Sequence, residues 1–178
     1  MADKFTETTP EFWLRGPVEG VPHLLQPVAH ALLQAREEIF HAMANFPLQL
    51  LWTKPSGLAS VGFHLQHIAG VIDRLFTYAD DQPLSSLQLQ FLSEEGVEKP
   101  GIEVLTLIEK LDNQIDTAIN KLKDSDPDTI LQLRVVGRKK LSSTRFGLLF
   151  HAAEHTMRHT GQLLVTCRIL HTVSPTNE

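Results

Sequence analysis

The sequence predicts an all-α protein, a four-helix bundle with a short β-hairpin before the last helix. Four stretches repeat apolar residues at intervals of three and four, which is the period of an amphipathic helix. Proline and glycine separate these stretches. Hydrophobic residues make up 42% of the 178-residue chain, enough for one core without disulfides. We therefore expect one domain over residues 22–171, an N-terminal arm over 1–21 and a C-terminal tail over 172–178.

The first helix is predicted from about residue 22 to residue 44. Its apolar face consists of Leu25, Val28, Leu32, Ala35, Ile39 and Met43. Pro22 and Pro27 fall in its first turns, where a missing amide hydrogen costs least. The preceding arm is rich in proline and glycine, and we expect Phe12 and Trp13 to pin it to the bundle.

The second helix is predicted over about residues 58–78, after the turn-forming run at residues 54–57. Its apolar face consists of Val61, Leu65, Ile68, Ile72, Leu75 and Phe76. The polar connection at residues 80–99 follows, and residues 87–92 within it are expected to form a helical turn. Its length is sufficient for a crossover along the bundle.

The third helix is predicted over about residues 101–123 and ends near Pro127. Residues 130–141 alternate partly around Gly137, which indicates a hairpin. The fourth helix is predicted over about residues 143–171, with Ser142, Ser143 and Thr144 as candidate N-caps. It is apolar on more than one face, so we expect one face to pack against a second subunit in a homodimer.

Charge and cysteine content exclude several classes of protein. The net charge is -5 and the 16 basic residues are scattered, which argues against nucleic-acid binding. Cys167 is the single cysteine, so it forms no internal disulfide. No apolar run is long enough to cross a bilayer, and the first ten residues lack the pattern of a secretory signal. We expect a soluble, cytoplasmic protein.

The positions of the histidines in the sequence suggest a metal-binding site. Five of the nine fall in two short clusters, one in the second predicted helix and one in the fourth: His64 and His67, and His151, His155 and His159. Residues four apart on a helix lie about 5–6 Å apart on one face, so His155 and His159 can converge on one metal ion. Two ligands rarely hold an ion firmly, and the other cluster can supply a third.

Spacing alone leaves alternative ligand sets open. His151 lies four residues before His155, so this helix offers two possible pairs. His64 competes with His67 on the second helix, at a rotation of about 60°. Gln162 lies three residues beyond His159 and is a candidate for the open side of the site, or a solvated residue.

Two segments resemble the DinB family, within the DinB/YfiT superfamily, of bacterial metal-binding four-helix proteins. They are Ser60–Gly70 (SVGFHLQHIAG) and Glu154–Leu163 (EHTMRHTGQL). The resemblance implies that His67, His155 and His159 are the metal ligands. It leaves His64 and His151, with Gln162, as residues that line the pocket or contact the ligands. It also implies an antiparallel bundle with one long crossover, frequently assembled as a homodimer.

Three neutral imidazoles would leave a divalent cation with its full charge and an open coordination position. Nickel and zinc are the expected ions, with iron(II) as an alternative. Relatives that the chain resembles include enzymes using low-molecular-weight thiols, so a metal-dependent thiol S-transferase is the first hypothesis. A metal-dependent hydrolase and a non-catalytic, stress-associated binding module are the alternatives. No catalytic residue is assigned, although Glu154, Asp73 and Arg158 are candidates for acid or base.

Overall fold

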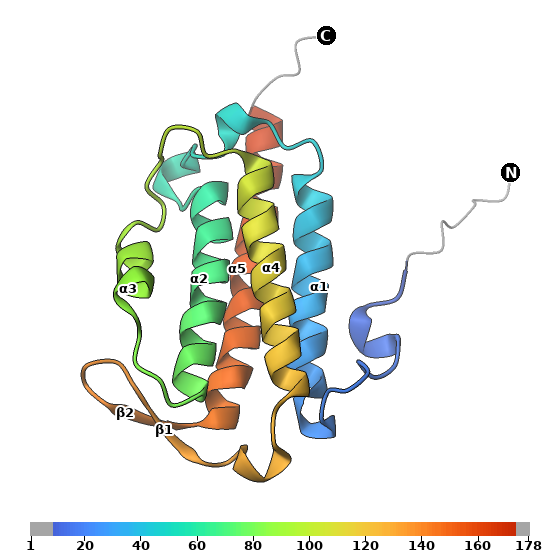
Figure 1. The fold of residues 1–178 in the computed structure, drawn as a ribbon. Coiled ribbons are helices and arrows are strands. Elements are labelled where there is room, and N and C mark those ends of the chain that lie inside the picture. Colours follow the sequence, from blue (N-terminus) through green and yellow to red (C-terminus); the bar gives the residue numbers. More distant parts are fainter. Residues whose placement is uncertain (1–8, 174–178) are drawn as a thin grey trace, which may run out of the picture.

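A computed structural model of the chain describes residues 9–173 and confirms the all-α fold (Figure 1). The first three of five α-helices in this range are α1 (Gln26–Met43), α2 (Val61–Ala79) and α3 (Ser86–Ser93). The others are α4 (Val104–Lys123) and α5 (Arg145–Val173). The predicted hairpin is present as β1 (Leu133–Val136) and β2 (Leu141–Thr144), an antiparallel pair in which Leu133 faces Thr144.

The four long helices form the bundle, and α3 lies outside it beside α2 (Figure 1). Helices α1 and α5 run in one direction, and α2 and α4 run in the other. The connection between α2 and α4 therefore returns along the length of the bundle and carries α3 with it, which confirms the long crossover. The family resemblance implied antiparallel packing, and α2 is indeed antiparallel to α5, whereas α2 and α4 are parallel.

Side-chain caps set where several helices begin. The Ser60 hydroxyl accepts a hydrogen bond from the Phe63 amide, so α2 starts at Val61, three residues later than predicted. Ser85 and Gln88 form a capping box that starts α3. Among the three candidate caps of α5, the Thr144 hydroxyl accepts from the Gly147 amide at 3.0 Å.

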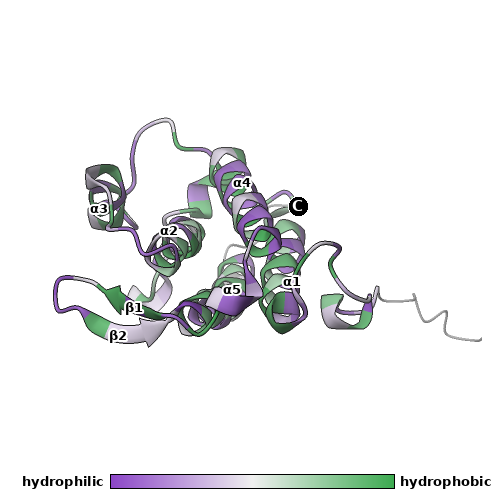
Figure 2. Cartoon of the chain, turned by 60° about the horizontal axis from the view of Figure 1, so that its bottom comes forward, coloured by the Kyte–Doolittle hydropathy of each residue, from purple (hydrophilic) through white to green (hydrophobic). Residues whose placement is uncertain are grey.

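The core lies between the four long helices, where their hydrophobic faces meet (Figure 2). The predicted apolar faces of α1 and α2 are buried, except for the partly buried Leu75, and several core residues have no exposed surface: Leu25, Leu32, Ile39, Leu65, Ile72, Leu111 and Ile115. Helix α2 packs against both α4 and α5, and its buried residues come from most of its circumference. Polar side chains on its α5 side are therefore enclosed.

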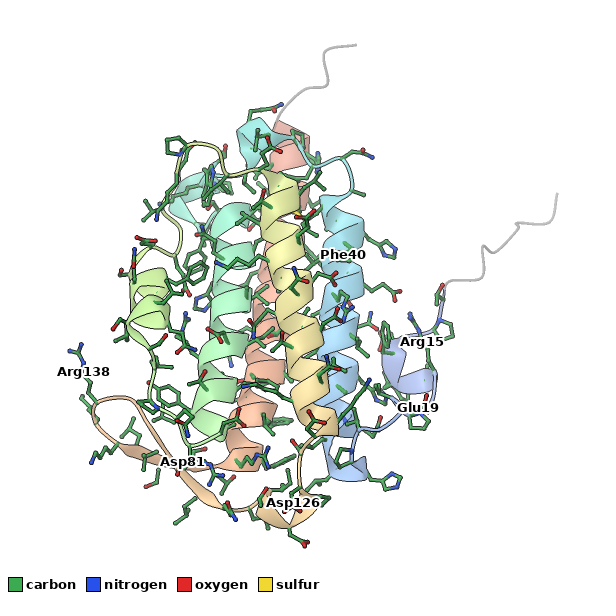
Figure 3. The ribbon with its side chains drawn as sticks, viewed as in Figure 1. Arg15, Glu19, Phe40, Asp81, Asp126 and Arg138 are labelled. Atoms are coloured by element: carbon green, nitrogen blue, oxygen red, sulfur yellow. The ribbon has the colours of Figure 1, made fainter. Side chains whose placement is uncertain are left out.

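The arm is attached differently from the prediction. Trp13 is 63% exposed, so it does not pin the arm. The Arg15 guanidinium instead pairs with Glu37 on α1 at 2.7 Å, and the Phe12 amide donates to the Gln34 side chain. Figure 3 shows Arg15 on the arm beside α1. Phe12 and Trp13 line a hollow together with Ala31 of α1 and Met157 of α5, but the indole ring is not buried in it.

The remaining differences concern element ends. Residues 23–25 form a 3-10 turn, so α1 begins at Gln26, and α4 begins at Val104. The strands lie three residues later than the predicted hairpin, and α5 continues to Val173. The first eight residues of the predicted arm and residues 174–178 of the predicted tail lie outside the described range. Within that range, no helix has both the length and the apolar character needed to cross a bilayer.

Candidate metal centre

Three imidazoles converge on the seam between α2 and α5. His67 comes from α2, and His155 and His159 come from successive turns of α5. One nitrogen atom of each ring lies within 4.8 Å of one nitrogen of each of the other two. The Nε2 atoms of His67 and His155 are 3.1 Å apart, and the ring centroid of His159 lies 4.4 Å from that of His67. This arrangement can hold a metal ion, since all three donors can turn toward one point.

His67 is held on the side away from this cluster. Its Nδ1 atom lies 2.6 Å from Glu95 Oε2, in the connection that follows α3. A carboxylate can only accept, so Nδ1 carries the proton and Nε2 of the neutral ring presents its lone pair to the cluster. The Phe63 ring stacks on His67 at a centroid distance of 5.1 Å and an angle of 13°. Carboxylate–histidine pairs of this kind orient metal ligands and raise their basicity.

Glu95 is itself enclosed and paired. Its side chain is 5% exposed, and its second oxygen accepts a 2.6 Å hydrogen bond from Arg74 of α2. Gly70, one turn before Arg74, makes room for the pair, because a Cβ atom there would fall on the Glu95 carboxylate and the Arg74 guanidinium. The two carboxylate oxygens are thus committed to His67 and Arg74, and the ion pair ties the crossover to α2.

The next residue of the crossover is tied down as well. The Gly96 amide donates a 2.7 Å hydrogen bond to the buried side chain of Gln66. Gly96 has φ +79°, and any Cβ atom there would also crowd the Phe63 ring. Only glycine fits this position without strain, so the backbone passes close to α2 and places Glu95 over His67.

His64 contacts the third imidazole of the cluster, that of His159. It is 3% exposed, and its Nδ1 atom lies 3.1 Å from Nδ1 of His159, so one ring donates to the other. Burial lowers the pKa of His64 to about 4, helped by the nearby His67. Burial likewise lowers the pKa of His159 to about 4, with further contributions from His67 and His155. Both rings are therefore neutral at pH 7, and His159 can present Nε2 to a metal.

His155 is the least restrained of the three. Its Nδ1 atom is buried and has no hydrogen-bond partner in the described part of the chain, which leaves a buried polar atom uncompensated. Burial, and then the nearby His67, lower its pKa. The cluster fits a divalent cation, which would replace the contact between the Nε2 atoms of His67 and His155 and take their lone pairs.

The other predicted site residues lie around the cluster or away from it. His151 is half exposed and its Nδ1 atom lies 2.7 Å from Glu154 Oε1, which also accepts from Arg158. Gln162 is exposed, and its assignment to the open side of the site stays a prediction. Asp73 accepts a hydrogen bond from Gln88 of α3, on another face of α2.

Sequence reasoning missed Glu95, Arg74, Phe63 and Gln66. Glu95 lies 28 residues from His67 in a segment without periodicity, so no spacing rule links the two. The signal that was available is Gly96, a glycine directly after two acidic residues in the crossover, since an isolated glycine can mark close approach of the backbone.

Comparison with known proteins supports the fold and the family. A family model described as the DinB superfamily matches residues 31–163. No curated protein matches the chain. The crystal structure of a conserved protein from Enterococcus faecalis superimposes with a TM-score of 0.64. That protein is 18% identical, and the superposition covers 81% of this chain and 95% of the other, a likeness of fold alone.

Proposed function

This chain belongs to the DinB superfamily, and we propose that it binds one divalent metal ion through His67, His155 and His159. The observation that carries the proposal is the convergence of three imidazole nitrogens within 4.8 Å of one another. Two of these rings have their other nitrogen occupied, by Glu95 and by His64. Held imidazoles of this kind are typical of a prepared metal site.

Nickel or zinc is the proposed ion, with iron(II) as the alternative. Neutral imidazole suits all three ions, and the described residues within reach of the cluster supply no thiolate that would select a softer metal. Three protein ligands would leave room for a further ligand, which is typical of catalytic rather than closed structural sites.

For the chemistry, we propose a transferase that acts with a low-molecular-weight thiol. A bound divalent cation would lower the pKa of a thiol or water molecule at its open position. A thiol, with a pKa of about 8.5, needs far less assistance to ionise than water does. Both oxygens of Glu95 are already engaged, so this carboxylate is poorly placed to take a proton from water. Thiol chemistry therefore ranks above metal-dependent hydrolysis, and a non-catalytic binding module is the third alternative.

The protein side chains would orient the reactants. Phe63 lies against His67, with His159 at a centroid distance of 6.3 Å, and gives the cluster an apolar wall. Glu95 keeps the proton of His67 on Nδ1, and His64 occupies Nδ1 of His159. These contacts prevent the two ligand rings from turning when a substrate approaches.

The test begins with elemental analysis of the purified protein, where we expect close to one nickel or zinc ion per chain. Metal-loaded protein is then incubated with cysteine or glutathione and an electrophile such as chlorodinitrobenzene, and thiol consumption is followed. His159→Ala should abolish both metal and activity. A mutant that keeps both would refute the site, and metal without thiol conjugation would favour the hydrolase or the binding module.

A homodimer is part of the proposal. Phe150 and Val165 on α5 are 51% and 59% exposed, as expected of a helix face that packs against another subunit. Sedimentation velocity should give twice the mass of one chain at micromolar concentration. A stable monomer would refute the dimer without affecting the metal site.

A further inference from the structure

A second group of possible metal ligands lies on the solvent side of the first. His151, Glu154 and His155 each offer one donor atom, and these atoms also lie within 4.8 Å of one another. All three come from α5, at positions i, i+3 and i+4, which share one side of a helix. We call this group the outer set, and His67, His155 and His159 the inner set.

The two sets differ in exposure and share one residue. The side chains of His151 and Glu154 are 50% and 33% exposed, whereas His67 of the inner set is 18% exposed. His155 belongs to both sets. Donor side chains therefore continue along α5 from the more exposed outer set to the less exposed inner set.

His155 is also the ligand whose ring has no hydrogen bond with any described residue outside the inner set. Glu95 and His64 hold the Nδ1 atoms of His67 and His159, but the Nδ1 atom of His155 has no partner in the described range. Within the described range, the ring has to break only the 3.1 Å contact between its Nε2 atom and His67 Nε2 to change its orientation. The shared residue is the one that can serve either set.

We propose that the outer set is an entry site through which a divalent cation reaches the inner set, a role that rests on the proposed metal-binding function. The ion first meets His151 and Glu154, then keeps His155 as a ligand while the other two exchange for His67 and His159. Retaining one protein ligand avoids a step in which the ion must be fully released to water. In the outer set, the ion replaces the contact between His151 Nδ1 and Glu154. The proton on Nδ1 passes through solvent to Nε2, which frees the Nδ1 lone pair for the ion.

Arg158 opposes this first step. Its guanidinium donates to both oxygens of Glu154, at 2.8 and 3.1 Å, and its positive charge repels a cation. An ion must compete with Arg158 for the carboxylate, so the outer set holds it weakly and passes it on. Glu154 attracts the cation and Arg158 repels it. Replacing Glu154 should therefore slow metal loading, whereas replacing Arg158 should accelerate it.

The test measures rates of metal transfer in the full-length protein. Metal-free protein is mixed with Ni²⁺ or Zn²⁺ in a stopped-flow instrument, with a chromophoric chelator reporting the free ion. Release is followed after adding excess chelator. For His151→Ala we expect loading and release to slow by the same factor, about tenfold, with Kd unchanged. Loss of an entry site raises one barrier, which is crossed in both directions.

Two further variants and a control sharpen the result. Glu154→Gln should slow loading, whereas Arg158→Gln should accelerate it by freeing the carboxylate. His41→Ala removes an exposed histidine from α1 and should leave both rates unchanged. His151 and Arg158 are at least half exposed, so their replacement should not disturb folding.

Unchanged rates in His151→Ala would overturn the entry role. Two tightly held ions per wild-type chain would also overturn it, because the outer set would then be a resident site. These outcomes differ from failure of the proposed function, in which the wild-type chain takes up no ion at all.

Discussion

Helix α5 packs along α2 on one side and along α1 on the other. Both of these interhelical seams contain side chains of types that can bind a metal. On the α2 side are the histidines of the inner set. On the α1 side, a cavity of about 620 Å³ is lined by Glu38, His41, Cys167 and His171, among others. Only the α2 seam brings three donors together, and the described residues of the α1 seam contain no such group. Residue type is therefore insufficient to define a site.

Neighbouring side chains account for the difference. On the α1 seam, the His171 ring meets Phe46 edge-on at 5.5 Å, which directs it toward an apolar partner. Cys167 is 5% exposed, and burial raises the pKa of its thiol to about 12, so it is not a thiolate ligand at neutral pH. On the α2 seam, Glu95 and His64 each occupy the outer nitrogen of a histidine ring. Convergence depends on such supporting contacts.

The largest difference between the seams should appear on removal of one histidine from each. His159→Ala should weaken metal binding by more than about 100-fold, because loss of a supporting residue alone costs about 10–100-fold. His171→Ala should leave affinity unchanged. Competition titration with a chelator of known affinity measures both. Equal losses in the two variants would show that the ion is not held at the α2 seam.

Glu95→Gln tests the supporting contact rather than a ligand. The amide keeps the size of the side chain but no longer holds the proton on His67 as a carboxylate does, so we expect affinity to fall by about 10–100-fold. Glu38→Gln, at the α1 seam, is the matched control and should have no effect. A purely structural role for Glu95 would lower the melting temperature of the metal-free protein while leaving metal affinity unchanged.

Gly70→Ala should cause part of the loss in metal affinity expected for Glu95→Gln, although Glu95 is still present. The added methyl group would displace the Glu95 carboxylate and Arg74, both nearly enclosed. We expect a fall in metal affinity smaller than for Glu95→Gln, and a lower melting temperature, since disturbing a buried ion pair is costly. Gly161→Ala on α5 is the control, because its Cβ atom would meet nothing within 4 Å. If Gly70→Ala matched that control, the Glu95–Arg74 pair would have little influence on the site.

The pH dependence of stability should separate His64 and His159 from the exposed histidines. The pKa values of His64 and His159 are lowered to about 4 from 6.5, so the unfolded chain binds more protons between these values. Stability of the metal-free protein is then fully present above pH 6.5 and is lost as pH falls toward 4. We expect the melting temperature to fall between pH 6.5 and 4.5. His64→Gln should flatten this dependence, and an unchanged slope would contradict the assignment.

The smallest effect is expected at Cys167. Cys167→Ala should change metal affinity by less than about twofold and lower stability by roughly 1 kcal/mol, since the thiol behaves as a small buried hydrophobe. In the folded wild-type protein, iodoacetamide should modify this thiol only slowly. Rapid modification that is blocked by bound metal would place Cys167 near the ion and erase the contrast between the seams.

Local chemistry in the sequence determined the helices, because apolar spacing and capping residues act within a few turns. The apolar faces of α1 and α2 were predictable for this reason, as was the hairpin around Gly137. The choice of His67, His155 and His159 required more than spacing, since His64 and His151 offered the same separations. Resemblance to the DinB family selected the three, and family membership is now shown, while metal binding stays a proposal.

The tertiary structure alone decided which groups support those histidines. Glu95 reaches His67 only because the crossover returns along α2 and Gly96 permits a close approach. Trp13 lies mostly exposed although we expected it to pin the arm to the bundle, because its burial depended on the surface that the packed helices present beside it. Helical periodicity and capping are properties of residues close together in the sequence. Contacts such as that of Glu95 with His67 join distant parts of the chain, so they exist only after the helices have packed.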